Sequence, residues 1–266
     1  MSEAKPLALV TGASAGIGAT FARHLARAGY GLILVARRAN LLESLAHELG
    51  GAETLEADLT SEDGLRRVEA RIDAAEGLEL VANNAGFGLA GRFFDTPVEG
   101  HTRMHQLHVM AAMRLSHAAL RNMVRRGKGA LINVSSVASF SQSPGAVSYS
   151  ATKAWMTSFT EGLYLDLQSA GSPVRVQALC PGFTYSEFHD VMGMDRGSIP
   201  GWLWWQADDV VAASLKGLER GKVIVIPGLF YRALVGVMKL VPRSLYYRVV
   251  GRYARRTRRI AELPGK

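Results

Sequence analysis

The feature that most constrains the fold is a glycine-rich turn between an apolar run and a helical pattern. Leu7-Ala8-Leu9-Val10 is typical of a buried strand, and the next eight residues read Thr-Gly-Ala-Ser-Ala-Gly-Ile-Gly. Apolar residues at Phe21, Leu25 and Ala28 then recur at helical spacing. Glycines in such a turn let the backbone approach a diphosphate, and the helix that follows offers free amide groups and the positive end of its dipole. This order predicts a nucleotide-binding α/β fold.

A second feature, Tyr149 with Lys153 and the upstream Ser136, predicts acid/base chemistry. Apolar residues at helical spacing predict a helix over residues 147–168. The i, i+4 spacing then places Tyr149 and Lys153 on one face. A lysine near the phenol favours the phenolate, so we expect a lowered tyrosine pKa. A change of about three units requires roughly 4 kcal/mol, which we expect the lysine and a nearby nicotinamide cation to supply together. Ser136 is expected to donate a hydrogen bond to a substrate oxygen whose proton Tyr149 gives or takes.

Three more motifs follow expected strands in order. They are Ala57-Asp58-Leu59, then Asn83-Asn84-Ala85-Gly86 after a strand at 80–82, and Pro181-Gly182 after a strand at 174–179. With these motifs the chain resembles the short-chain dehydrogenase/reductase family over residues 5–228. The resemblance implies a Rossmann-like, doubly wound parallel sheet with helices on both faces in a single domain.

The same resemblance implies roles for individual residues. Tyr149 is expected to be the catalytic acid/base, Lys153 to bind the cofactor ribose and lower the tyrosine pKa, and Ser136 to orient the substrate. Asp58 is expected to meet the adenine, and residues 181–184 to border the nicotinamide. The cofactor-binding residues expected besides Tyr149, Lys153 and an arginine discussed next are Gly12, Ser14, Gly16, Ile17, Gly18, Asp58, Leu59, Asn84, Gly86, Pro181, Gly182 and Thr184. No metal site is expected.

The end of the second expected strand bears on cofactor choice. An acidic residue there would bind the ribose hydroxyls and repel a 2′-phosphate, but the sequence reads Val35-Ala36-Arg37-Arg38. Arg37, with Arg38 beside it, offers a guanidinium suited to that phosphate, which predicts NADP(H) as cofactor. The alternative is that both arginines are solvated at the start of a helix.

His108 departs from the family pattern. Aligning residues 107–111 with the helix after the Asn-Asn-Ala-Gly segment places this histidine where the family usually has an asparagine that holds a water in a proton relay. A histidine can carry protons near neutral pH, so His108 is a candidate member of the relay. The alternative is a histidine that is packed and hydrogen-bonded within a helix.

The basic residues of the chain are concentrated at its end. Residues 228–266 have a net charge of +9, whereas the whole chain has +8. Arg248, Arg252, Arg255 and Arg259 recur at helical spacing opposite an apolar side. We therefore expect a catalytic domain at 1–228 and a basic amphipathic extension at 229–266. The extension can bind an anionic membrane surface or an anionic carrier group; the alternatives are docking on its own domain or on a second subunit.

The substrate class is indicated by a loop at about residues 183–207. It is rich in large apolar side chains, namely Phe183, Phe188, Met192, Met194, Ile199, Trp202, Leu203, Trp204 and Trp205. Such a loop favours an apolar, lipid-like, aromatic or steroid-like substrate. The alternative is that the tryptophans pack the loop onto the core or across a subunit interface.

Together these patterns predict an NADP(H)-dependent oxidoreductase that acts on an apolar ketone, aldehyde or secondary alcohol, in a direction that the sequence leaves open. The alternatives are a non-catalytic NADP-binding sensor or scaffold, and an isomerase or dehydratase that uses the cofactor transiently. The resemblance implies a homodimer or homotetramer, and no nucleic-acid partner is expected. A short polar start and a single cysteine, Cys180, predict a cytoplasmic protein that can be peripheral to the membrane.

Overall fold

A parallel sheet forms the centre of the computed structural model, which describes residues 5–188, 192, 197 and 199–261, with side chains described up to Arg252. Within these residues the sheet has seven strands in the order β3-β2-β1-β4-β5-β6-β7, and every neighbouring pair is parallel. The strands are β1 (Leu7–Thr11), β2 (Gly31–Ala36), β3 (Glu53–Glu56), β4 (Leu78–Asn83), β5 (Ala130–Val134), β6 (Arg175–Leu179) and β7 (Ile224–Val225). The chain winds outward from β1 to β3 and then crosses back to β4, so the strand order reverses beside β1.

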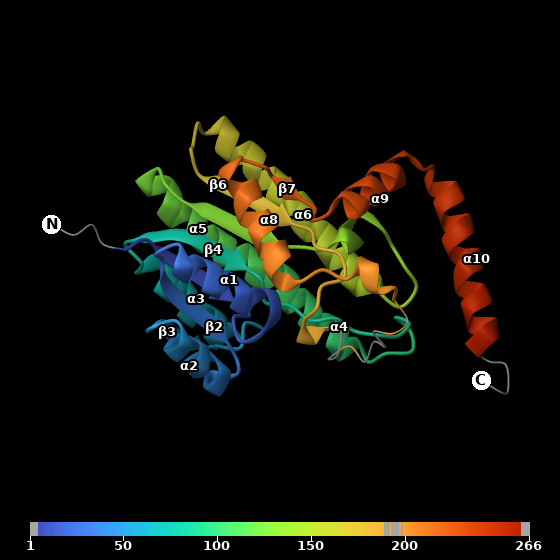
Figure 1. Ribbon diagram of the computed structural model, residues 1–266, viewed down its shortest axis with the longest axis horizontal. Coiled ribbons are helices and arrows are strands. Elements are labelled where there is room, and N and C mark those ends of the chain that lie inside the picture. The colour runs from blue at the N-terminus through green and yellow to red at the C-terminus, as the bar shows by residue number, and fades with distance from the viewer. Residues whose placement is uncertain (1–4, 189–191, 193–196, 198, 262–266) are drawn as a thin grey trace.

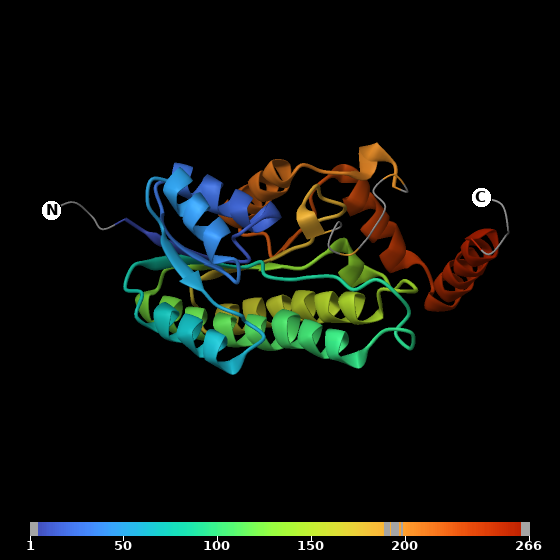
Figure 2. The ribbon, with the colours of Figure 1, turned by 90° about the horizontal axis from the view of Figure 1, so that it is seen from below.

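Helices cover both faces of the sheet (Figure 2). One face carries α1 (Gly16–Arg27), α2 (Ala39–Glu48) and α8 (Ala207–Glu219), and the other carries α3 (Glu62–Asp73), α5 (Ala112–Arg126) and α6 (Val147–Ser169). The doubly wound fold predicted from the sequence is therefore confirmed, and the helix expected at 147–168 is α6.

The strand sequences explain the two layers. Side chains of a strand alternate between its faces. Ala8 and Val10 of β1 pack with the α1 layer, whereas Leu9 packs with the α3 layer. On β2, Leu34 packs with the α1 layer and Val35 packs with the α3 layer. Because both faces are covered, such strands read as continuous apolar runs rather than as alternating patterns.

The remaining elements gather at the edge of the sheet where the strands end. Helix α4 (Val98–His105) runs into a π-helix at Gln106–Ala111, and two short 3₁₀ helices are η2 (Val137–Phe140) and η4 (Gly201–Leu203). Helix α9 (Leu229–Leu240) lies at this end of the molecule, and α10 (Arg243–Ala261) stands away from the body in both views (Figures 1 and 2). None of the helices in the described part of the chain is both long and apolar enough to cross a bilayer.

Leu42 provides a test of the α2 layer because its side chain is fully buried against the sheet. Leu42→Ala should lower the free energy of unfolding by about 2–5 kcal/mol, since it removes buried methyl groups and leaves a cavity. Ser44→Ala, at an exposed position of the same helix, should change it by less than about 0.5 kcal/mol. Urea unfolding followed by circular dichroism measures both, and equal effects of the two variants would contradict this packing.

Candidate active site

The residues that the sequence singled out lie mostly where strands end. Because parallel strands all end at one edge, the loops that follow them come together there. The turn after β1 holds Gly12, Ser14, Gly16, Ile17 and Gly18; Arg37 follows β2, Asp58 and Leu59 follow β3, Asn84 and Gly86 follow β4, Ser136 follows β5, and Pro181, Gly182 and Thr184 follow β6. Tyr149 and Lys153 come from α6, and His108 comes from the π-helix.

The turn between β1 and α1 has the geometry that a diphosphate requires. Gly12 and Gly16 have φ of 66° and 54°, a region that favours glycine. A Cβ on Gly18 would lie 2.3 Å from the Gly12 carbonyl oxygen, so a side chain there would displace the turn. Among the described residues, no side chain caps the start of α1. The turn therefore fits the diphosphate of a dinucleotide cofactor, with amide groups and the helix dipole directed at it.

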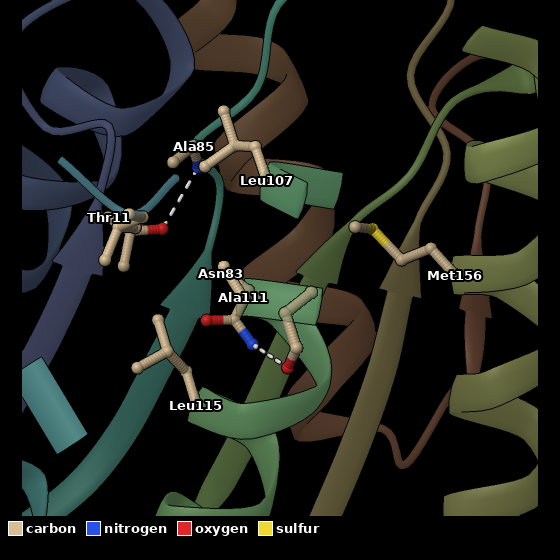
Figure 3. Close-up of a pocket in the computed structure, with 9 residues that line it drawn as sticks. Thr11, Asn83, Ala85, Leu107, Ala111, Leu115 and Met156 are labelled. Atoms are coloured by element: carbon tan, nitrogen blue, oxygen red, sulfur yellow. Dashed lines mark hydrogen bonds between the residues drawn. The ribbon is translucent and has the colours of Figure 1, made fainter. Parts of the chain in front are cut away.

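Thr11, which the sequence reasoning missed as a functional residue, ties this turn to the loop after β4. Its hydroxyl accepts a hydrogen bond from the backbone N–H of Ala85 at 3.0 Å (Figure 3). It also accepts one from the backbone N–H of Asn84 at 3.0 Å. The Asn84 side chain donates in return to the Thr11 carbonyl, at 2.9 Å. Beneath these bonds lies a cavity of about 10 Å³ whose lining includes Leu59 and Asn83. The sequence signal for Thr11 was its position as a small polar residue at the end of an apolar strand.

The two arginines after β2 have different surroundings. Arg37 lines an open depression of about 470 Å³, together with Asp58 and Arg67. Arg38 instead donates to the Ser14 hydroxyl at 3.0 Å and forms a 2.9 Å ion pair with Glu187. Arg38 thus contacts the glycine turn at Ser14, whereas Arg37 faces the depression. Arg67 is an additional cation there that the sequence did not indicate.

Asp58 is held as a carboxylate in that depression. Burial opposes its charge, but hydrogen bonds from the Thr60 amide and hydroxyl, at 2.9 and 2.8 Å, outweigh it. The positive charge of Arg37 acts in the same direction, so the pKa of Asp58 lies below its usual range. An ionised acceptor is therefore present beside Arg37.

Lys153 is a buried cation at the centre of the site. Its side chain donates from Nζ to the Val134 carbonyl oxygen at 2.7 Å, and Nζ lies 5.8 Å from the centre of the Tyr149 ring. The residue is 4% exposed, and burial lowers the pKa of Lys153 to about 8. The Ser135 hydroxyl donates to the Lys153 carbonyl at 2.8 Å and so fixes α6 against the end of β5.

Tyr149 and Ser136 lie together beside this lysine. Burial raises the pKa of Tyr149 to about 12, although its hydrogen bond with Ser136 acts in the opposite direction. In the protein alone the direction is opposite to the lowered pKa expected with both Lys153 and a nicotinamide cation nearby, because removal from water penalises the phenolate and the Lys153 ammonium is directed to Val134. Ser136 accepts from the Ala138 amide at 3.1 Å and donates to the Pro181 carbonyl over a long 3.5 Å, so its proton is only weakly engaged.

His108 is fully buried, and both of its ring nitrogens have partners. Since the Thr152 hydroxyl donates to the Tyr149 carbonyl, it accepts from His108 Nδ1 at 3.0 Å. Nε2 accepts from the Phe87 amide at 3.1 Å. Burial, reinforced by the charge of Lys153, holds the pKa of His108 well below its usual range. The histidine is therefore neutral and joins the loop after β4 to the turn of α6 that carries Tyr149.

Some side chains of the substrate loop pack against the domain, and others lie at the site. Trp204 is buried and stacks on Tyr185 with ring centres 5.0 Å apart, and Trp205 packs against Gly228. These two tryptophans support the packing alternative. Phe188 instead lies over the Tyr149 ring, with centres 5.6 Å apart.

Met192 lies near Phe188 above Gly88, where a Cβ would meet both side chains. Among the described residues of the loop, Phe188 therefore contacts Tyr149, and Met192 lies next to Phe188. Met194 falls outside the described residues.

Comparisons with known proteins agree with this geometry. A model of the short chain dehydrogenase family matches residues 6–196. An uncharacterized oxidoreductase of Myxococcus xanthus is 36% identical over 244 residues, which cover 90% of this chain and 94% of the relative.

Two solved structures are also similar. A short-chain dehydrogenase from Sphingobium yanoikuyae in complex with NADPH has a TM-score of 0.80 and 37% identity, covering 88% of this chain and 94% of that chain. The bulky-bulky ketone specific alcohol dehydrogenase from Comamonas testosteroni has a TM-score of 0.76 and 31% identity, covering 89% and 95%. The chain therefore belongs to the short-chain dehydrogenase family of oxidoreductases.

Proposed function

We propose that the protein is an NADP(H)-dependent oxidoreductase that interconverts an apolar ketone or aldehyde and the corresponding alcohol, with Tyr149 as acid/base. The observation that carries the proposal is the position of Ser136, Tyr149 and Lys153 at the same edge of the sheet as the glycine turn. A cofactor-binding turn and an acid/base pair at one edge are the two parts that such a reaction requires.

Ser136, Tyr149 and Lys153 each have a distinct role when the reaction runs in the reducing direction. The cofactor, when bound, supplies the hydride. Ser136 can turn its weakly engaged proton toward the substrate oxygen and hold it near Tyr149. The high pKa of Tyr149 keeps the phenol protonated, so it can donate its proton to that oxygen as negative charge develops there. Lys153 uses one proton for Val134 and has two more for the phenol and the cofactor ribose.

The preference for NADP(H) rests on charge. Arg37 and Arg67 line the depression after β2 and β3, together with the carboxylates of Glu56, Asp58 and Asp63. Arg38 contacts Ser14 of the glycine turn, and the sequence from 32 to 38 contains no acidic residue. Guanidinium groups suit the dianionic 2′-phosphate. The relative from Sphingobium yanoikuyae, solved in complex with NADPH, supports the same choice.

An apolar substrate is supported by Phe188 against Tyr149, by Met192 beside Phe188, and by the relative specific for bulky-bulky ketones. A homodimer or homotetramer built on the long helices α5 and α6 remains our proposal for the assembly, as does a cytoplasmic location.

Removal of the phenol hydroxyl tests the acid/base role. Tyr149→Phe should lower kcat by about 10²–10⁴-fold because the proton donor is lost. The dissociation constant of NADPH, followed by its fluorescence, should change much less. Tyr164→Phe, which alters a tyrosine farther along the same helix, is the matched control. Turnover that survives in Tyr149→Phe would contradict the mechanism, and a wild type that binds NADPH without turnover would favour the sensor alternative.

The arginines can be tested by cofactor binding alone. Arg37→Ala and Arg38→Ala should each raise the dissociation constant of NADPH by about tenfold, since a charge-assisted hydrogen bond to the 2′-phosphate is lost. The dissociation constant of NADH should stay within about twofold, because NADH lacks that phosphate. Arg66→Ala, an exposed arginine on α3, provides the control. The NADP assignment is wrong if neither variant distinguishes the two cofactors.

We further propose that His108 positions the site and does not relay protons. Because its pKa is lowered, the imidazole stays neutral through the range where a free histidine titrates. The kcat profile from about pH 5.5 to 8 should therefore have the same shape in the wild type and in His108→Asn. His108→Ala, which leaves Phe87 N–H and Thr152 without this partner, should lose about 1–3 kcal/mol of stability. A change of slope in the wild-type kcat profile near the usual histidine pKa, absent from the His108→Asn profile, would contradict this proposal and support the relay.

A further inference from the structure

The C-terminal helices α9 and α10 carry a large apolar surface that the domain leaves uncovered. Helix α9 is anchored by Tyr231, whose hydroxyl donates to the Leu203 carbonyl at 2.7 Å and accepts from the Phe183 amide at 3.2 Å. Tyr231 and Val235 are buried. Eight large apolar side chains in the described part of these helices are exposed, namely Leu229, Phe230, Leu234, Val237, Leu240, Leu245, Tyr247 and Val249. Met238, Tyr246 and Val250 are half-buried, and Tyr246 donates to the Gln142 carbonyl.

These side chains are highly exposed, and the apolar surface that they form continues onto the substrate loop. Leu229 and Leu240, at the two ends of α9, are 78% and 84% exposed. Phe230 packs edge-on against the exposed Trp202, with ring centres 4.8 Å apart. An exposed apolar patch that spans a helix and continues onto a neighbouring loop is typical of an interaction surface.

The charges on the same helices decide which partner fits. Residues 228–252 contain five cations, Arg232, Lys239, Arg243, Arg248 and Arg252, and no acidic residue. A symmetric contact of this surface with the same surface of a second copy would bring two cationic surfaces together without an acidic residue of 228–252 to neutralise them. An anionic lipid surface would instead neutralise them while it takes up the apolar side chains, which is how interfacial helices bind.

The pair of helices also has a suitable position. It lies at the end of the molecule where the strands terminate, and α10 stands away from the body, so a flat surface can approach it (Figures 1 and 2). The side chains of α10 after Arg252 fall outside the described residues and are not needed for this inference.

We propose that α9 and α10 form a docking surface for an anionic phospholipid bilayer. The surface binds through apolar insertion of the exposed α9 side chains and through ionic contact of the cations with lipid headgroups. This interaction is separate from the oxidoreductase reaction, so it can be measured without turnover.

The direct test is flotation of the full-length protein with vesicles of phosphatidylcholine that contain phosphatidylglycerol, and with vesicles of phosphatidylcholine alone. We expect binding to the anionic vesicles, binding that weakens as salt is raised, and little binding to the zwitterionic ones. Tyr149→Phe should bind like the wild type, which separates this proposal from the proposed reaction.

Two double variants test the two contributions. Leu229→Ser/Leu240→Ser should weaken binding by about tenfold or more, because both apolar side chains are exposed and lose their insertion. Arg232→Gln/Arg248→Gln should weaken it by roughly 10- to 30-fold. The controls are Leu165→Ser, at a 64% exposed position of α6, and Arg121→Gln/Arg125→Gln on α5, both toward the opposite edge of the sheet.

Several results would overturn the proposal. One is no binding to anionic vesicles, and another is equal binding to both kinds of vesicle. A third is a change from a larger assembly to a smaller one in Leu229→Ser/Leu240→Ser, measured by size-exclusion chromatography with light scattering, in a protein that ignores vesicles. That third result would assign the surface to contact between copies of the chain.

Discussion

A parallel sheet ends all of its strands at one edge, and that constraint organises the rest of this structure. The loops after β1, β4, β5 and β6 must start within a few strand spacings of one another, because the strands are hydrogen-bonded neighbours. Polar residues that are far apart in the sequence, such as Thr11 and Asn84, are thereby brought within hydrogen-bonding distance. The backbone of the sheet thus brings the residues of the site together, whatever contacts their side chains then make.

The electrostatics of the site follow from burial. Removal from water favours the neutral forms of Lys153 and Tyr149, whose pKa values move to about 8 and about 12 in opposite senses. The protein alone therefore keeps the phenol protonated, as proton donation to a carbonyl oxygen requires. His108 is neutral for the same reason, and its two hydrogen bonds join the Phe87 amide to the Thr152 hydroxyl.

The sequence predicted the parts of the fold and site that depend on local pattern. The strand at Leu7–Thr11, the helix at Val147–Ser169 and the shared face of Tyr149 and Lys153 are all local, and the structure agrees with them. Features that depend on tertiary packing were missed. The π-helix, the contact of Arg38 with Glu187 and the support of Gly182 by Tyr231 join distant segments, so no local period indicates them. The raised tyrosine pKa of the protein alone could not be expected from the sequence, because burial cannot be read from helix spacing.

The central claim is that this site reduces apolar carbonyl compounds with NADPH. The most direct measurement is nicotinamide absorbance at steady state, with NADPH and a panel of ketones and aldehydes graded from short and polar to long-chain and aromatic. We predict oxidation of NADPH whose kcat/KM rises with the apolar size of the substrate. Substrate consumed without net change in absorbance would indicate an isomerase or dehydratase. No turnover across the panel by a protein that binds NADPH would contradict the claim.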